Sequence, residues 1–260
     1  MLLTMDIGNT NIKSALFDGH EMRKYWRIAT NRSMSSDELG MMMMNLLHYN
    51  HFEVDQVDGI IMSSVVPQIN FTVEHMCRNY FGMEPMKIGP GIQTGITVKY
   101  ESPHELGSDR IANAAAAYHL YGGPCITIDF GTATTFGVVS REGEFLGGAI
   151  APGLKLAAEA LTERAAKLPR FELSKPDSVI GRNTITNMQS GIVFGYVGQV
   201  NYLVSRMKQE LNDPTTRVIA TGGLAVLVAE ESRVIDVMDG LLTLKGLMLI
   251  HEKNAEGARA

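Results

Sequence analysis

The sequence predicts an α/β protein made of two duplicated halves, each a mixed β-sheet with flanking helices. The first observation is a strand, glycine turn and strand that occur twice, as MDIGNTNIKSALF from Met5 and as IDFGTATTFGVV from Ile128. In each copy an acidic residue, Asp6 or Asp129, stands two positions before a glycine. The second observation is that similar elements follow both copies in the same order. A chain of 260 residues is long enough for two such halves.

The first half begins with three strand-like runs, LLTMD, IKSALF and KYWRIA, which are separated by the turn sequences GNTN and DGHE. Ser35 and Glu38 form a capping-box pattern and predict that a helix follows. Its apolar stripe consists of Leu39, Met42, Met43, Leu46 and Leu47. A buried strand at GIIMSSV, a helix begun by Pro67 and a short strand at PMKI come next. The order is therefore three strands, then helix, strand, helix and strand.

The second half repeats this order with strands at CITIDF, TFGVVS and FLGGAIA, and with a helix opened by Pro152 and Gly153. Residues 165–183 have mixed polarity and predict a connecting loop. A long helix is expected from Thr184 to Leu211, and TRVIATGG is expected to be a strand ending in two glycines. The expected apolar side of the long helix comprises Ile185, Met188, Ile192, Tyr196, Leu203 and Met207. We place the two halves at residues 1–118 and 119–260.

Composition narrows the class of protein. The chain is 45% hydrophobic and 20% charged, which is typical of globular proteins with sizeable cores. A net charge of −5 argues against a nucleic acid partner. Cys77 and Cys125 show no metal-ligand or disulfide pattern, so we expect reduced, buried thiols. The sequence has no signal-peptide pattern and no membrane-length apolar run, which predicts a cytoplasmic protein with no membrane partner.

The segment DIGNTNIK has the properties of an anion-binding turn. Gly8 and its small polar neighbours let main-chain N–H groups approach a phosphate, and Asp6 at the strand end can hold a hydrated cation. Lys13 can neutralise a phosphate oxygen, although a solvent-facing lysine is nearly as common on such a strand. An ordinary hairpin turn would explain this motif alone. Its near-copy at Asp129 favours a nucleotide that both halves face.

Two further motifs, IDFGTATT and ATGG, carry candidate residues. Thr132, beside Gly131, can donate a hydroxyl to a phosphoryl group, as can Thr134 and Thr135, but threonine is also simply a good strand residue. Gly222 and Gly223 of ATGG can let a base or ribose rest against the main chain, although paired glycines often merely start a helix.

The segment GSDRIANA also permits two interpretations. Asp109 at a helix start can be an N-terminal cap, or it can accept a proton from a substrate hydroxyl while Arg110 binds a carboxylate or amide and Gly107 permits close approach. Spacing alone does not choose between them. Gly191, Gly195 and Gly198 of the long helix predict close packing, either internal or at a subunit interface.

Taken together, seven motifs give the sequence a resemblance to the type III pantothenate kinases, members of the actin, hexokinase and Hsp70-like superfamily with ribonuclease-H-like halves. The motifs are DIGNTNIK, GSDRIANA, IDFGTATT, GGAIAPG, IGRNTITNMQSGIVFGYVGQV, ATGGLA and LTLKGL. The resemblance implies a nucleotide cleft between the halves and transfer of the γ-phosphoryl group of ATP to the primary hydroxyl of pantothenate. The product would be 4'-phosphopantothenate, in the first step of coenzyme A synthesis.

The resemblance also implies roles for individual residues. Asp109 would be the catalytic base, Asp129 would hold a monovalent cation, K⁺ or NH₄⁺, near Thr132, and Asp6 would hold Mg²⁺. ATP would contact Asp6, Ile7, Gly8, Asn9, Thr10, Asn11, Ile12, Lys13, Thr132, Gly222 and Gly223. Pantothenate would be surrounded by Tyr100, Gly107, Ser108, Asp109, Arg110 and Thr184. A homodimer with the substrate site at or beside the subunit interface is also implied.

Two alternatives remain open on the sequence. The first is another enzyme on the same scaffold, such as a sugar or acetate kinase or a polyphosphate hydrolase, because the glycine turns would recognise the nucleotide and not the acceptor. The second is a regulatory protein that retains a nucleotide site and acts by binding a partner.

Overall fold

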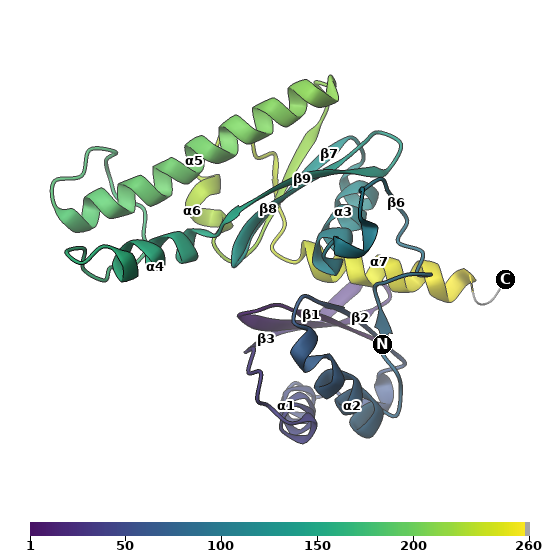
Figure 1. Ribbon diagram of the computed structural model, residues 1–260. Helices are drawn as coiled ribbons and strands as arrows, with labels where there is room; N and C mark the ends of the chain where they lie inside the picture. The colour runs from purple at the N-terminus through teal and green to yellow at the C-terminus, as the bar shows by residue number, and fades with distance from the viewer. Residues whose placement is uncertain (258–260) are drawn as a thin grey trace. The chain divides into compact units, whose positions relative to one another are not determined.

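The computed structural model describes residues 1–257, which form two compact units, each built on its own mixed β-sheet (Figure 1). The first unit contains Met1–Ile96, Glu101–Ala116 and the segment that begins at Leu242. The second contains Thr97–Tyr100 and Ala117–Leu241. Two mixed sheets with flanking helices confirm the predicted fold class.

The first unit has a five-stranded sheet. In spatial order its strands are β3 (Glu21–Ala29), β2 (Asn11–Asp18), β1 (Leu2–Ile7), β4 (Gly59–Ser64) and β5 (Met86–Lys87). The strands β1, β2 and β3 form antiparallel hairpins, whereas β4 runs parallel to β1 and β5 runs parallel to β4. Asp6 and Ile7 at the end of β1 are therefore level with Ser63 and Ser64 at the end of β4. This register places both strand ends at the same edge of the sheet.

Helices cover both faces of this sheet. Helix α1 (Ser36–Tyr49) and helix α2 (Asn70–Phe81), which follows a 3₁₀ turn at Pro67–Ile69, lie on one face, and α7 (Leu242–Gly257) lies on the other (Figure 1). The predicted capping box is present, since Ser35 Oγ accepts from Glu38 N while the Glu38 carboxylate accepts from Ser35 N. The start of α1 is thus fixed by local hydrogen bonds.

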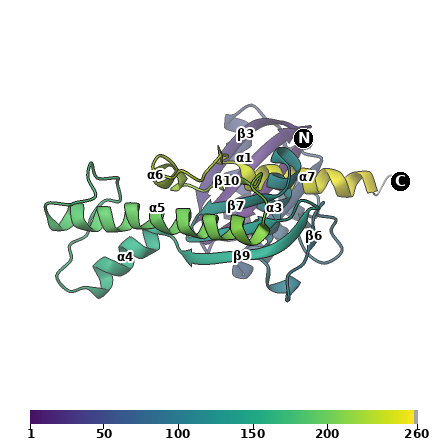
Figure 2. The ribbon, with the colours of Figure 1, turned by 90° about the horizontal axis from the view of Figure 1, so that it is seen from above.

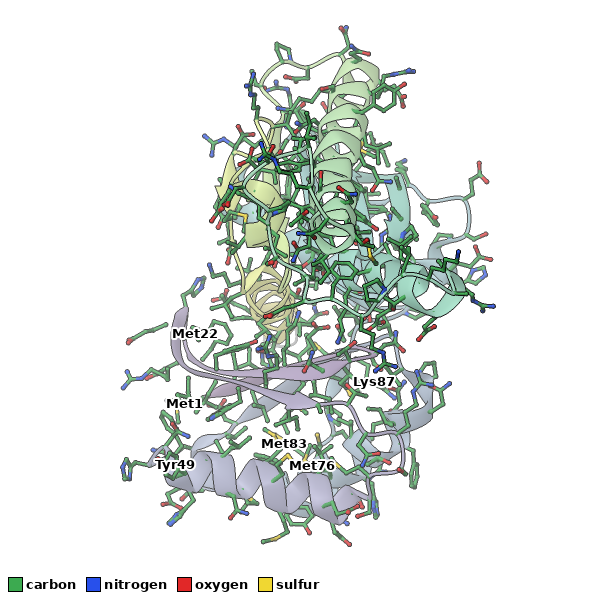
Figure 3. The ribbon with its side chains drawn as sticks, turned by 90° about the vertical axis from the view of Figure 1, so that its left-hand side faces the viewer. Met1, Met22, Tyr49, Met76, Met83 and Lys87 are labelled. Atoms are coloured by element: carbon green, nitrogen blue, oxygen red, sulfur yellow. The ribbon has the colours of Figure 1, made fainter. Side chains whose placement is uncertain are left out.

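Methionines fill much of the layer between the sheet and its helices. Met43 and Met76 are fully buried in the same apolar cluster, and Met83 packs against it. Figure 3 shows Met76 and Met83 between the sheet and α1. Met41 of the run MMMM is exposed. The run therefore contributes one buried methionine, Met43, to the cluster, as expected of flexible core filling.

The second unit has a six-stranded sheet. Its strands in spatial order are β11 (Val237–Met238), β10 (Arg217–Thr221), β7 (Cys125–Phe130), β8 (Ala133–Val139), β9 (Glu144–Pro152) and β6 (Thr97–Val98). The hairpin of β7 and β8 repeats that of β1 and β2, and β10 runs parallel to β7 as β4 does to β1. The repeated topology agrees with the predicted duplication.

Three helices of the second unit, α4 (Leu154–Arg164), α5 (Thr184–Leu211) and α6 (Ala225–Ala229), contribute to one apolar core with β7, β8 and β10. Helices α4 and α5 run side by side (Figures 1 and 2). The bounds of α5 are those predicted. Its buried side differs in part, because Val193, Val200 and Val204 are fully buried, whereas Ile185 is exposed.

The compact units differ from a simple division at residue 118. The unit boundary falls within α3 (Ser108–Tyr121), and α7 belongs to the first unit although it ends the chain. The reason is packing: Leu244, Leu247 and Ile250 are buried on a helix that contacts β1, β2 and β4. No helix within residues 1–257 is long and apolar enough to cross a membrane.

Candidate active site

The turn between β1 and β2 is held by hydrogen bonds from its own residues and from the chain after β3. Gly8 N donates to Asn11 O at 3.0 Å, and Thr30 Oγ1 donates to Gly8 O at 2.6 Å. Arg32 Nη2 donates to Asn9 Oδ1 at 3.1 Å. Asn9 and Thr10 remain exposed at the tip. A fixed turn that presents small polar groups to solvent fits the phosphate tail of a nucleotide.

Asp6 lies beneath this turn with only 7% of its surface exposed. Its two carboxylate oxygens have different partners: Ser63 Oγ donates to Oδ1 at 2.9 Å, and Lys13 Nζ lies 3.6 Å from Oδ2. The half-buried Lys13 supplies a positive charge at the turn, and the Asp6 carboxylate supplies an oxygen ligand. No three His, Cys, Asp or Glu side chains among the described residues form a metal site of their own. This donor set suits Mg²⁺ that arrives with phosphates, because such ions need only one or two carboxylates.

The side chains of Ile7 and Ile12 belong to the buried core of the first unit. Ile7 O accepts from Val65 N at 3.0 Å. The side chains of these two residues thus stabilise the turn from below, and only their main chain can take part in the predicted nucleotide contact.

The GSDR segment begins α3 two residues earlier than an N-cap role for Asp109 requires. Helix α3 starts at Ser108, so Asp109 lies in the first turn, where its charge is favourable to the helix dipole. Asp109 Oδ1 accepts from Arg110 N at 2.8 Å. A Cβ atom at residue 107 would lie 2.5 Å from Asp109 Oδ1. Gly107 is therefore required for this position of the carboxylate.

The neighbours of Asp109 are firmly placed. Ser108 Oγ accepts from Ser64 N at 3.0 Å and lies 3.2 Å from Ser64 O, to which it donates. The Arg110 side chain is buried. The side chain of Ser108 thus contacts the main chain of β4, and Ser108 is expected to hold the segment in place.

In the second unit the structure brings the motifs IDFG and ATGG together. Thr221 of β10 is level with Asp129 of β7. Gly222 follows with a φ of +98°, and a Cβ there would lie 2.7 Å from Asp129 Oδ1 and 2.6 Å from the main chain of Phe130. Glycine is needed at position 222 because φ is positive and because a Cβ would lie too close to neighbouring atoms. Gly223 is exposed next to it.

Thr132 is exposed in the β7–β8 turn, where its carbonyl oxygen accepts from Gly153 N at 3.0 Å. A Cβ at Gly153 would overlap that oxygen, which explains the last glycine of GGAIAPG. Thr134 is fully buried in β8, and its Oγ1 has no hydrogen-bond partner among the described residues. Thr132 is therefore the threonine of this turn that presents its side chain to solvent.

Tyr100 and Thr184, expected near pantothenate, both belong to the second unit. The ring centroids of Tyr100 and Phe145 are 6.3 Å apart. Thr184 is the first residue of α5 and is exposed, just after the N-cap Asn183, whose Oδ1 accepts from Thr186 N. Tyr100 thus packs against β9, whereas Thr184 stands at a capped helix start.

The two cysteines are free and buried. Burial raises the pKa of the thiols of Cys77 and Cys125 to about 12. Both thiols are therefore protonated near neutral pH, as expected of reduced, buried cysteines.

Sequence reasoning missed the residues that support the candidates. Ser63 and Ser64 come from the end of β4, and Thr30 and Arg32 follow β3, so none of them is near the motifs in sequence. Serine and threonine at strand ends are common, and no spacing rule connects them to Asp6. Only the register of β1 with β4 reveals the contact.

Comparison with known proteins identifies the fold and the family. A structure of a Baf family protein from Campylobacter jejuni, named for transcriptional activation, matches with a TM-score of 0.63 and 20% identity, covering 98% of this chain and 99% of that one. Component A of (R)-2-hydroxyglutaryl-CoA dehydratase from Acidaminococcus fermentans matches at 0.58 and 16% identity, covering 98% of each chain. The ROK hexokinase of Thermus thermophilus matches at 0.56 and 13% identity, covering 98% and 99%. These likenesses show an actin- and hexokinase-like fold.

The family model of the type III pantothenate kinases matches residues 2–206. The matched segment contains Asp6, Asp109 and Asp129, and therefore the carboxylates of all three motifs described above. Because the match spans most of the sequence, the chain belongs to the type III pantothenate kinase family, phosphotransferases of coenzyme A biosynthesis that use ATP with Mg²⁺.

Proposed function

We propose that this chain transfers the γ-phosphoryl group of ATP directly to the primary hydroxyl of pantothenate, giving 4'-phosphopantothenate. The family match supports the acceptor, and the position of Asp109 supports the mechanism. Phosphoryl transfer depends mainly on alignment and on neutralising charge, so no covalent intermediate with the protein is required.

Asp109 would act as the general base, and its local geometry is the observation that carries the proposal. Gly107 leaves space for the carboxylate, and Arg110 N fixes one of its oxygens. A base must be held in a defined orientation if it is to accept a hydroxyl proton as the phosphoryl group transfers. Arg110 would bind a polar group of pantothenate, Tyr100 and Thr184 would complete its surroundings, and Ser108 would hold the segment in place.

The β1–β2 turn would bind the phosphates. Magnesium that accompanies ATP supplies charge neutralisation, and Asp6 would be its protein ligand. Lys13, 3.6 Å from Asp6 Oδ2, would be drawn to phosphate oxygens while remaining near that carboxylate. Thr132, Gly222 and Gly223 would contact the same nucleotide from the second unit.

Asp129 would hold a monovalent cation, K⁺ or NH₄⁺, near Thr132. The glycines at 131 and 222 lie beside the buried Asp129 Oδ1, since added Cβ atoms would lie 3.6 and 2.7 Å from it. Carboxylate and carbonyl oxygens are suitable ligands for such an ion.

A homodimer through α5 is part of the proposal. Gly191, Gly195 and Gly198 lie on one exposed side of the helix, and a Cβ at any of them would meet nothing within 4 Å. Internal packing thus gives no reason for these glycines, which supports the alternative of a second copy packed closely against them. Tyr202, 62% exposed on the same side, would extend the contact.

The test is ATP-dependent phosphorylation of pantothenate by the purified chain with Mg²⁺, in parallel K⁺ and Na⁺ buffers. We expect turnover, and we expect Asp109→Asn to lose most of it while retaining the fold and MgATP binding. Near-normal turnover of Asp109→Asn would remove the base role and leave Asp109 as a charge at a helix start. If folded wild-type protein binds MgATP without phosphorylating pantothenate, a panel of sugars and acetate would test another acceptor, and failure of the whole panel would favour a regulatory role.

A further inference from the structure

The last two residues of β4, Ser63 and Ser64, are hydrogen-bonded to Asp6 and to the residue before Asp109, and these two aspartates carry the candidate carboxylates of the first unit. Adjacent residues of a strand point to opposite faces, so the two serines have different surroundings. The Ser63 side chain contacts Asp6, whereas the main chain of Ser64 contacts the residue before Asp109. One strand end is thus connected to both carboxylates.

Ser63 determines how the Asp6 carboxylate is oriented. Ser63 is 1% exposed, and its Oγ donates to Asp6 Oδ1 at 2.9 Å. Oδ2 faces Lys13 at 3.6 Å. A buried hydroxyl that donates to a carboxylate forms a charge-assisted bond and limits rotation of the group. Without Ser63, Oδ1 would lose a buried donor.

Ser108 fixes the beginning of α3 on the same strand end. Its hydroxyl accepts from Ser64 N at 3.0 Å and donates to Ser64 O at 3.2 Å, so it bonds to both main-chain polar groups of one residue. Ser64 is itself held, because its Oγ donates to Asn70 Oδ1 at 2.6 Å and accepts from Val66 N at 3.2 Å. The start of α3 cannot shift without breaking these bonds.

We propose that Ser63 and Ser108 are positioning residues which orient the Asp6 and Asp109 carboxylates from a common anchor, the end of β4. Ser108 acts through the main chain of Ser64 and not through direct contact with the acceptor. This inference rests on the proposed function for the roles of the two carboxylates. Neither serine touches substrate in this proposal, and each determines where a reacting group is held.

The experiment compares Ser63→Ala and Ser108→Ala with Thr4→Val as the matched control. Thr4 also has a buried hydroxyl in this sheet, but it donates to Ala15 O and touches neither carboxylate. We expect Ser63→Ala to weaken MgATP binding about tenfold by calorimetry, the effect of losing one hydrogen bond to a charged group. We expect Ser108→Ala to lower kcat about tenfold or more, with the affinity for MgATP and the KM for pantothenate within about twofold of wild type. Ser108→Thr, which keeps the hydroxyl, should restore kcat.

The outcomes separate this proposal from the proposed function. Direct contact between Ser108 and pantothenate predicts a raised KM with kcat retained, and that result would overturn its positioning role. If wild type turns over but both alanine variants behave as Thr4→Val does, the anchor is refuted while the kinase function stands. If wild type binds MgATP but does not phosphorylate pantothenate, the kinase function fails. The calorimetric comparison of Ser63→Ala with Thr4→Val still decides the Ser63 contact in that case.

Discussion

Gly246 of α7 lies directly against the main chain of Ala112 in α3. A Cβ atom at residue 246 would overlap the carbonyl oxygen of Ala112. Nearby, Thr243 Oγ1 donates to Asn113 Oδ1 at 2.8 Å, and both side chains are buried. These contacts explain the glycine in LTLKGL, and they explain why the last helix belongs to the first unit.

We therefore expect Gly246→Ala to destabilise the protein by about 2 to 3 kcal/mol, because a methyl group placed against main-chain atoms forces the two helices apart. Gly240→Ala is the control, since Gly240 is exposed just before α7 and a Cβ there meets nothing within 4 Å. The urea midpoint of unfolding is the measurement. Equal midpoints for the two variants would show that α3 and α7 separate easily.

The sequence was sufficient for the elements whose causes are local. The capping box of α1, the bounds of α5 and the two glycine hairpins all follow from residues a few positions apart. The position of α7 could not be predicted in this way, because it depends on Gly246 meeting a helix more than 100 residues earlier in the chain. The two-residue strands β6 and β11 depend likewise on their partners β9 and β10.

The candidate site likewise contains residues that could be predicted from the sequence and residues that could not. Asp6, Asp109 and Asp129 stand in recognisable motifs, so their places could be predicted. Ser63, whose hydroxyl is bonded to Asp6 from a neighbouring strand, could not. In this site the candidate catalytic and binding residues lie in local patterns such as glycine turns, whereas the residue that supports Asp6 is brought to it by strand register.

If Asp129 binds a monovalent cation, turnover should depend on which cation is present. Asp129→Ala should abolish any activation by K⁺ over Na⁺, because the carboxylate that binds the ion is lost, and turnover should fall to the level seen without K⁺. Asp177→Ala removes an exposed carboxylate of the same unit and should leave activation by K⁺ intact. Initial rates across a K⁺ titration provide the test. Activation of Asp129→Ala with the wild-type K⁺ dependence would exclude this ion site.

His251 should make the folded protein less stable in mild acid. Burial lowers the pKa of His251 below 6.5, an effect larger than the opposing influence of Asp58, and the ring packs against Gly59, where a Cβ would lie 2.8 Å from Nε2. The unfolded chain thus takes up this proton more readily than the folded one. The contribution of His251 to stability is present above pH 6.5 and is lost as pH falls through the lower folded pKa.

The thermal midpoint should therefore decrease between pH 7.5 and pH 5.5, and His251→Gln should reduce that decrease. His104→Gln changes an exposed histidine of the same unit and serves as the control. A decrease that is the same in wild type and His251→Gln would assign the pH dependence to other groups.

The glycine-bearing side of α5 is the proposed contact between two copies of the chain. If a second copy packs against Gly195, Gly195→Glu should place a charge in an apolar contact and dissociate the dimer, with little effect on the fold because a Cβ there meets nothing in its own chain. Sedimentation should show the 28.4 kDa monomer in place of twice that mass. Gly89→Glu adds the same charge at an exposed glycine of the first unit and should leave the mass unchanged. Because Thr184, proposed to border pantothenate, begins the same helix, turnover should fall together with the mass. A monomeric wild type that phosphorylates pantothenate at full rate would show that the substrate site is complete within one chain.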